Sequence, residues 1–165
     1  MARDRRRGNI VLHLTPPKLT PFCTLEVELA PIRQMGQARF GDRRIIPIVG
    51  GRVTGERVSG RILNLGADWQ TVAHDGIAEL DARYAFETED GALIEVVNQG
   101  FRHGPPEVMK QLASGAPTSP DSYYMRTVAR LETGHADYLW VNRMLFLGTG
   151  ARNASMVQID LYCVE

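Results

Sequence analysis

The sequence has few cysteines, no long apolar run and no excess of charge of either sign. Two cysteines, Cys23 and Cys163, are too few for a disulfide framework or a zinc motif, and their apolar neighbours are typical of buried free thiols. No stretch approaches the ~18 consecutive apolar residues of a membrane-spanning helix. The 19 basic and 19 acidic side chains cancel, so no overall charge attracts the chain to nucleic acid or to acidic lipid.

Motifs for metals and cofactors are also absent. The four histidines are scattered and form no close pair, so no metal site is predicted. The chain has no P-loop, dinucleotide fingerprint or Gly-x-Ser-x-Gly sequence, and any chemistry should therefore need no cofactor. The N-terminus lacks the apolar core of a secretory signal, so we expect a cytoplasmic protein.

The N-terminal region differs in composition from the rest of the chain. Residues 1–21 are first rich in arginine and then in proline, which predicts an extended lead-in. The arginines could form an arm that binds nucleic acid or a membrane, but no aromatic or amphipathic pattern accompanies them, and a solvated terminus is the simpler interpretation. We place one domain at residues 22–165.

Strand patterns dominate that domain. Residues 24–29 alternate strictly between polar and apolar, with a period of two. Asp90-Gly91 separates two such patterns, residues 77–88 and 92–102, which is a strong hairpin signal. Residues 43–49 contain Pro47, which favours an edge strand or a bulge. Further strands are expected at residues 52–65, 68–72, 123–132, 138–149 and 156–164.

One helix interrupts the strands. Residues 105–113 begin with proline, and Val108, Met109 and Leu112 follow at helical spacing. About eight to ten strands with short connections favour an all-β fold, a single antiparallel β-barrel with one short helix. Closure would remove the exposed sheet edges, and about eight strands leave room for side chains or one small ligand.

Polar residues on apolar strand faces are the first candidates for function. Asn142 would share a strand face with Trp140, Met144 and Phe146. A buried amide without a partner costs about 1–3 kcal/mol, so Asn142 either anchors a ligand in an apolar pocket or is paired with a neighbouring backbone group. Asn98 presents the same choice.

Charged and phenolic residues give a second group of candidates. Arg83 and Arg126 lie within strands, and each could hold a negative charge in a dry lumen or face solvent in an ion pair. Asp68 next to Trp69 could have a raised pKa and act as a base, or could cap a turn. Tyr124 could donate to a developing oxyanion, although most such tyrosines fill a core or an interface.

A series of short motifs carries a resemblance to a known family. They are Gly66-Ala67-Asp68-Trp69-Gln70, Arg83-Tyr84, Asp90-Gly91-Ala92-Leu93-Ile94, Asn98-Gln99-Gly100, Tyr123-Tyr124-Met125-Arg126, Glu132-Thr133-Gly134 and Tyr138-Leu139-Trp140-Val141-Asn142. In this order and spacing they resemble the domain of unknown function 3237, also named uncharacterised protein family 0311, from about Leu25 to Val164. Leu131 stands where the family often has phenylalanine.

The resemblance implies a small barrel of the lipocalin-like or allene-oxide-cyclase-like kind, which serves as a ligand carrier or as a cofactor-free enzyme. The family's polar motif positions, carried onto this chain, are Asp68, Arg83, Asn98, Arg126, Glu132 and Asn142.

These observations lead to one hypothesis and two alternatives. The hypothesis is a cofactor-independent isomerase, cyclase or lyase for a small hydrophobic, aromatic or polyketide-like molecule. Asp68 would be the acid or base, with Arg83, Asn142 and Tyr124 stabilising negative charge. The predicted substrate-binding residues are Trp69, Asn98, Arg126, Glu132, Trp140, Met144 and Phe146.

The first alternative is a carrier of a hydrophobic ligand, and the second is an assembly module with a filled barrel. A homo-oligomer, dimer or trimer, is expected because apolar residues such as Leu93, Val97 and Phe101 would need cover. No nucleic-acid or membrane partner is expected.

Overall fold

Residues 12–165, the part of the chain that the computed structural model describes, form ten β-strands and three short helices. The strands are β1 (Leu19–Leu29), β2 (Arg33–Ala38), β3 (Gly41–Thr54), β4 (Gly60–Ile62), β5 (Gly66–Val72), β6 (Ala78–Thr88), β7 (Leu93–His103), β8 (Tyr124–Glu132), β9 (Phe146–Arg152) and β10 (Met156–Val164). The helices are α1 (Pro106–Ala113) and the 3₁₀ helices η1 (Pro120–Ser122) and η2 (Ala136–Arg143).

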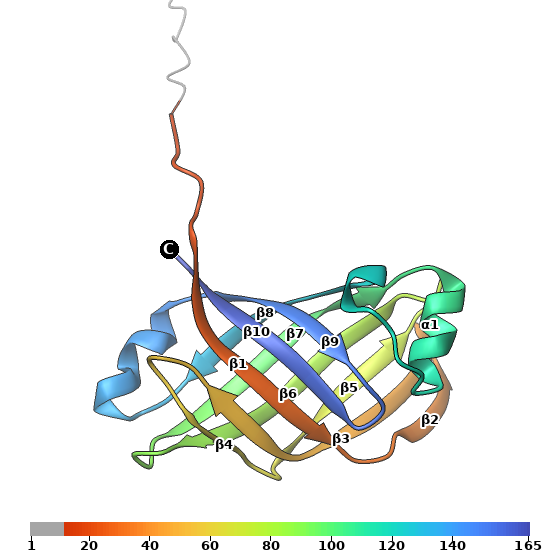
Figure 1. Cartoon of the computed structure of the whole chain (residues 1–165), viewed down its shortest axis with the longest axis horizontal. Helices are drawn as coiled ribbons and strands as arrows, with labels where there is room; N and C mark the ends of the chain where they lie inside the picture. Colours follow the sequence, from red (N-terminus) through yellow and green to blue (C-terminus); the bar gives the residue numbers. More distant parts are fainter. Residues whose placement is uncertain (1–11) are drawn as a thin grey trace, which may run out of the picture.

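The sheet closes on itself because β1 has a neighbour on each side. It pairs antiparallel with β10 and with β3, and Figure 1 shows β1 and β10 lying side by side. From β10 the order continues through β9, β8, β7 and β6, and β4 and β5 both connect β6 to β3. Since β4 and β5 share one place in the wall, the result is the predicted closed antiparallel barrel, with eight strand positions. The β2 strand pairs with β3 alone and extends beyond the wall.

Alternation along each strand separates the lumen from the outer surface. In β6, Leu80, Tyr84 and Phe86 are buried, whereas Glu79 is exposed. The β6–β7 turn forms at Asp90-Gly91 as expected, with Gly91 at φ +88°, a conformation that glycine adopts without a steric penalty. The period-two pattern in the sequence therefore separates the side chains that enter the barrel from those that face outward.

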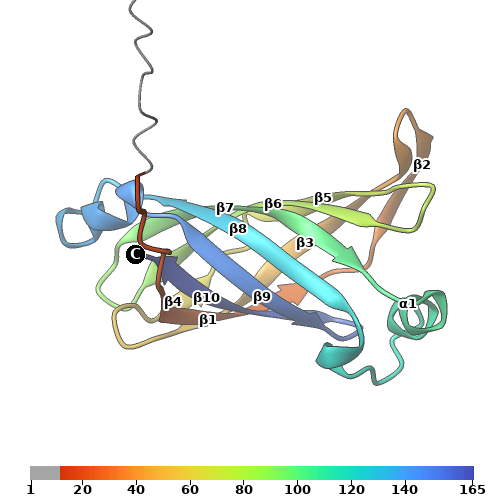
Figure 2. The same ribbon diagram turned by 90° about the horizontal axis from the view of Figure 1, so that it is seen from above.

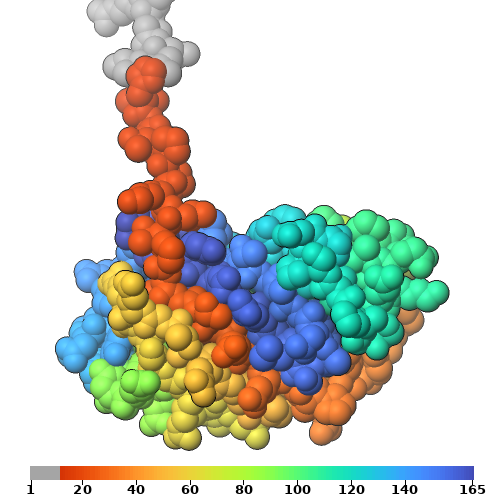
Figure 3. Space-filling model, viewed as in Figure 1, coloured from red at the N-terminus to blue at the C-terminus, as the bar shows by residue number. Residues whose placement is uncertain are grey.

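The two ends of the barrel are covered differently. Helix α1 lies at one end and η2 at the other (Figures 1 and 2). Pro106 stands in the first turn of α1, and Leu112 is its buried residue. In η2 the buried residue is Val141. The space-filling view shows α1 and the loop after it seated over their end of the barrel (Figure 3).

The interior contains two separate apolar clusters. The larger cluster runs from the η2 end into the middle of the barrel and includes Phe22, Phe86 and Phe146. The smaller cluster lies under α1 and joins Leu112 to Leu80 and Met125, with further residues. Both cysteines are buried and free, as expected, and burial raises the pKa of Cys23 to about 12.

The structure corrects three local expectations. Residues 136–143 form a 3₁₀ helix rather than the first part of a strand, because Tyr138 N–H donates to the His135 carbonyl and the apolar side chains of this segment turn onto the end of the core. Strand β3 is not an edge strand, since it pairs on both sides, but its register with β1 shifts between Ile48 and Gly50, close to Pro47, as the alternative expectation of a bulge requires. Strand β1 begins at Leu19, slightly before the expected domain boundary.

The expectations for the arginine-rich start fall on residues 1–11, which lie outside the described residues. Among residues 12–165 no helix is long and apolar enough to span a membrane.

Candidate functional site

A small cavity lies inside the barrel between the two apolar clusters. Its volume is about 40 Å³. Its lining mixes aliphatic and polar side chains, and the polar ones are Asp68, Gln70, Tyr84, Asn98, Arg102, Thr127 and Arg152. They come from β5, β6, β7, β8 and β9, so the site is a polar layer assembled by most of the wall rather than by one motif.

Asp68 supplies the carboxylate of this layer. Its Oδ1 accepts a hydrogen bond of 2.9 Å from the backbone N–H of Asp81, and its Oδ2 accepts one from Gln70 Nε2. Burial raises the pKa of Asp68, against the lowering effects of those two donors and of the positive charge of Arg102. A buried carboxyl group with a raised pKa can exchange a proton nearer neutral pH than an ordinary aspartate.

Four buried polar atoms of the layer have no hydrogen-bond partner within residues 12–165. They are Tyr84 Oη, Asn98 Oδ1, Arg102 Nη1 and Thr127 Oγ1. Asn98 is 2% exposed and Arg102 is 5% exposed, so bulk solvent does not satisfy them. Buried polar groups in proteins are nearly always paired, and four that converge on one cavity indicate a place where another molecule supplies the partners.

Three arginines give this end of the lumen a positive charge. Arg102 and Arg152 line the cavity, and Arg44 donates two hydrogen bonds, of 3.1 and 2.9 Å, to Gln70 Oε1. Desolvation, followed by repulsion from Arg152 and Arg44, lowers the pKa of Arg102 to about 10. Burial also lowers the pKa of Arg152, with repulsion from Arg44 adding to it.

The arginines are functional candidates that sequence reasoning missed. Each stands two positions from an inward residue on its own strand, since Arg44 precedes Ile46, Arg102 follows Gly100, and Arg152 follows Gly150. Continuing the period of two to the strand ends would have assigned them to the lumen. Gln70 and Thr127 stand two positions after Asp68 and Met125, so the same rule places them on the inward face.

Of the residues predicted from the sequence, Asp68 and Asn98 meet in this layer. The expectation that Arg83 lies in a dry lumen is wrong. Its side chain is 69% exposed on the outer face of β6, and its Nε donates to Glu95 Oε1 at 2.6 Å. Glu132 is also exposed, on the outer face of β8. The alternation along each strand directs both side chains away from the barrel axis.

Asn142 is paired with a neighbouring backbone group, which was the second of the two possibilities predicted for it. Its Nδ2 donates to the Thr133 carbonyl and its Oδ1 accepts from the Thr133 N–H, both at 2.9 Å. The amide therefore fastens η2 to the end of β8 and is not a ligand anchor. Trp140 and Met144 pack against the large core cluster and Phe146 belongs to it, so these three fill the barrel at the end away from the polar layer.

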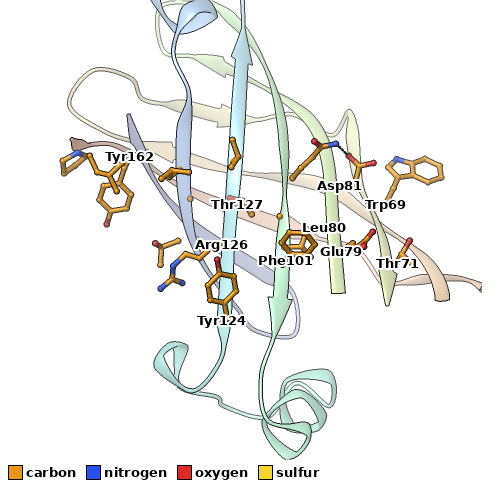
Figure 4. A pocket seen from close by; sticks show the side chains of 18 of the residues that line it. Trp69, Thr71, Glu79, Leu80, Asp81, Phe101, Tyr124, Arg126, Thr127 and Tyr162 are labelled. Atoms are coloured by element: carbon orange, nitrogen blue, oxygen red, sulfur yellow. Dashed lines mark hydrogen bonds between the residues drawn. The ribbon is translucent and has the colours of Figure 1, made fainter. Parts of the chain in front are cut away.

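A second, larger hollow lies on the outside of the barrel (Figure 4). It has a volume of about 1120 Å³ and collects three predicted site residues, Trp69, Tyr124 and Arg126, around the exposed Phe101. Tyr124 stacks on His103 with ring centroids 4.8 Å apart. The hollow offers apolar contact area, and of the four residues with unpaired, buried polar atoms only Thr127 also lines it within residues 12–165.

No group of three or more histidine, cysteine, aspartate or glutamate side chains is arranged to hold a metal ion among residues 12–165.

Comparison with known proteins identifies the family. The family model described as protein of unknown function (DUF3237) matches residues 17–164. The chain belongs to this family. A DUF3237 relative, the UPF0311 protein of Rhodopseudomonas palustris strain TIE-1, is 43% identical over 152 residues, which cover 92% of this chain and 99% of that protein.

Solved structures of similar proteins have the same fold. A conserved protein of unknown function from Rhodopseudomonas palustris matches with a TM-score of 0.87 and 41% identity, over 93% of this chain and 100% of its own. A β-barrel-like protein from Acinetobacter baumannii matches with a TM-score of 0.82 and 41% identity, over 93% and 99%. The DUF3237 barrel expected from the motifs is therefore confirmed.

A more distant structure shares the fold alone. It is described as an enzyme from Penicillium herquei, and it matches with a TM-score of 0.72 and 20% identity, over 94% of this chain and 100% of its own.

Proposed function

We propose that the polar layer is the active site of a cofactor-independent enzyme that moves protons on a small organic molecule. The observation that carries the proposal is the convergence of a buried carboxyl group and four unpartnered polar atoms on one cavity. The reaction class is isomerisation, cyclisation, or addition and elimination of a small group. The enzyme from Penicillium herquei supports the idea that a barrel of this fold can house catalysis.

Asp68 acts as the proton acceptor in this scheme. The carboxylate removes a proton from a carbon next to a carbonyl group, the electron pair of the broken C–H bond moves onto the carbonyl oxygen, and an enolate forms. Tyr84 O–H and Thr127 O–H are donors without partners, and they can bind the enolate oxygen. The protonated Asp68 then returns the proton to another atom of the same molecule, or the enolate expels a leaving group, which takes the proton from Asp68.

The size of the cavity sets a condition on substrate entry. Sites for drug-sized ligands occupy about 300–1,000 Å³, whereas this cavity has about 40 Å³. An aromatic or polyketide-like substrate therefore requires the α1 end to open, while the reacting group occupies the polar layer. Leu112 is the one fully buried side chain of α1 and Val108 and Met109 are partly buried against the same cluster, so opening this end separates three apolar side chains from the core.

Carriage of a hydrophobic ligand is the alternative function. A carrier needs a continuous apolar lumen whose polar groups are already paired. Here the unpaired layer of Tyr84, Asn98, Arg102 and Thr127 divides the two apolar clusters. A purely apolar ligand would leave those groups without partners, at about 1–3 kcal/mol each. This cost favours a substrate with polar atoms and hence catalysis.

Hydrogen exchange tests the proposal without knowledge of the natural substrate. Small carbonyl compounds, keto acids as well as cyclic ketones, 1,3-diketones and hydroxyaryl ketones, are incubated with the protein in D₂O, and NMR follows deuterium incorporation at the carbon next to the carbonyl. The wild type should accelerate exchange of at least one compound, and Asp68→Asn should reduce that rate by about 10²–10⁴-fold. Arg83→Gln, which alters an exposed arginine outside the lumen, is the matched control and should exchange like the wild type.

Two results would overturn the assignment. Exchange by Asp68→Asn at the wild-type rate would remove Asp68 from the mechanism. Binding of the compounds without accelerated exchange in any variant would favour the carrier.

A further inference from the structure

The charges around the lumen cavity do not balance. Among the described residues, Arg102 and Arg152 line the cavity with two positive charges and Asp68 lines it with one negative charge, and Arg44, which donates to the lining residue Gln70 without lining the cavity itself, adds a third positive charge. Asp42 on β3 attracts Arg44, but it does not figure among the charges acting on Arg102 or Arg152. Buried charges without partners are expensive, and proteins avoid them unless they serve a purpose.

Asp68 does not form an ion pair with any of these arginines within 4 Å in the described residues. Both of its carboxylate oxygens are already bound by neutral donors, Gln70 Nε2 and the Asp81 N–H. The carboxylate is thus held in place without the help of a guanidinium, and Arg102 remains available to another acceptor.

Arg102 is the arginine best placed to receive that acceptor. It is 5% exposed, it lines the cavity, and its Nη1 has no partner. Thr127 Oγ1 and Tyr84 Oη line the same cavity and are also unpaired. Arg102 suits a planar carboxylate, because guanidinium and carboxylate groups match in geometry and charge, and the two hydroxyls remain for the enolate oxygen of the proposed mechanism.

We propose that the substrate carries a carboxylate, and that this carboxylate binds Arg102 inside the barrel while Arg44 and Arg152 add positive potential. The inference rests on the proposed function and specifies its substrate class: an organic acid, with the reacting carbon next to Asp68 and the carboxylate on Arg102. The acid supplies the negative charge that the wall lacks. Neutral molecules of the same shape are rejected because they leave the arginines uncompensated.

Matched pairs of probes test the assignment. Acetate and benzoate are titrated against acetamide and benzamide at constant ionic strength, and binding is followed by NMR shift changes of lumen residues and by the melting temperature. The wild type should bind the acids and not the amides. Arg102→Gln should weaken acid binding by about 10–100-fold, the value of one hydrogen-bonded charge contact.

Variants separate this inference from the proposed catalysis. Asp68→Asn should lose turnover but bind the acids at least as tightly, since a nearby negative charge is removed. Arg83→Gln should bind like the wild type, because Arg83 lies outside the barrel. Should Arg102→Gln fail to fold, Arg102→Lys keeps the charge but not the planar fork, and it should bind the acids more weakly than the wild type does.

Three outcomes would overturn the carboxylate assignment. They are equal affinity for acids and amides, unchanged acid affinity in Arg102→Gln, and chloride stabilising the protein as much as acetate does. In each case, loss of hydrogen exchange in Asp68→Asn would still support the proposed role of Asp68 in proton transfer.

Discussion

Asp68 and Arg102 line the same cavity without forming an ion pair. The Asp68 carboxylate is instead bound by Gln70 and by the backbone N–H of Asp81. Arg102 lies close enough to lower the pKa of Asp68, but burial outweighs it and the net pKa is raised. The arrangement keeps an acid–base group and an anion-binding group separate within one small space, as a site that moves a proton on an acidic substrate requires.

The raised pKa of Asp68 predicts a pH-dependent loss of stability. Folding favours the protonated form, so the contribution of Asp68 is fully present below the ordinary aspartate value of 3.8 and is lost as the pH rises through the higher pKa of the folded state. Asp68→Asn cannot ionise, so its stability relative to the wild type should increase with pH above about 3.8. Urea unfolding at several pH values measures this difference, and a constant difference from pH 3 to 8 would contradict it.

Arg102 should cost stability in the free protein. Its guanidinium is buried, repelled by Arg152 and Arg44, and lacks a partner at Nη1. Arg102→Met removes that charge and keeps much of the side-chain volume, so the melting temperature should rise while acid binding is lost. A large drop in melting temperature would show that Arg102 holds the barrel together.

The same variant should shift the pH dependence of activity. Since Arg102 lowers the pKa of Asp68, its removal should raise that pKa further. The acidic limb of the pH–rate profile for hydrogen exchange should therefore move to higher pH. Arg83→Gln should leave the limb unchanged. An unaltered limb in Arg102→Met would mean that Asp68 does not set it.

Asn142 should matter for stability and not for turnover. Asn142→Ala removes two hydrogen bonds to the Thr133 backbone and should cost about 1–2 kcal/mol. Activity per folded molecule should match the wild type, because η2 lies at the opposite end from α1 and the polar layer. A specific loss of activity with full stability would return Asn142 to the site.

Gly148 tests the cavity through its neighbour Thr127, which lines the cavity. A methyl group at this inward position of β9 would clash with Thr127 Oγ1 and come within 3.0 Å of Ile159 Cγ2. Gly148→Ala should therefore weaken acid binding and cost about 1–3 kcal/mol. Gly134→Ala is the control, because nothing lies within 4 Å of a methyl group there. Equal binding by both variants would place the acid elsewhere.

The barrel follows closely from local patterns. The alternation of residues 24–29, the Asp90-Gly91 turn and the proline-led helix near residue 106 each appear where expected. Residues 138–145 were misassigned because alternating apolar residues also suit a short 3₁₀ segment that covers the end of a core. The hydrogen bonds between the Asn142 amide and the Thr133 backbone, nine positions apart in the chain, favour the 3₁₀ helix over the strand.

Residue types and periodicity alone determined that this chain forms antiparallel strands, that Asn98 is a polar group on an otherwise apolar face, and that Asp68 is a carboxylate next to an aromatic residue. Only the tertiary structure decided which face of each strand points inward, because a period of two separates the faces without saying which is enclosed. Closure between β1 and β3 directs Arg83 outward and Arg102 inward, and it brings the charges of Arg44 and Arg152, from two other strands, close to Arg102. A charge imbalance of that kind depends on distances across the barrel, which no local pattern contains.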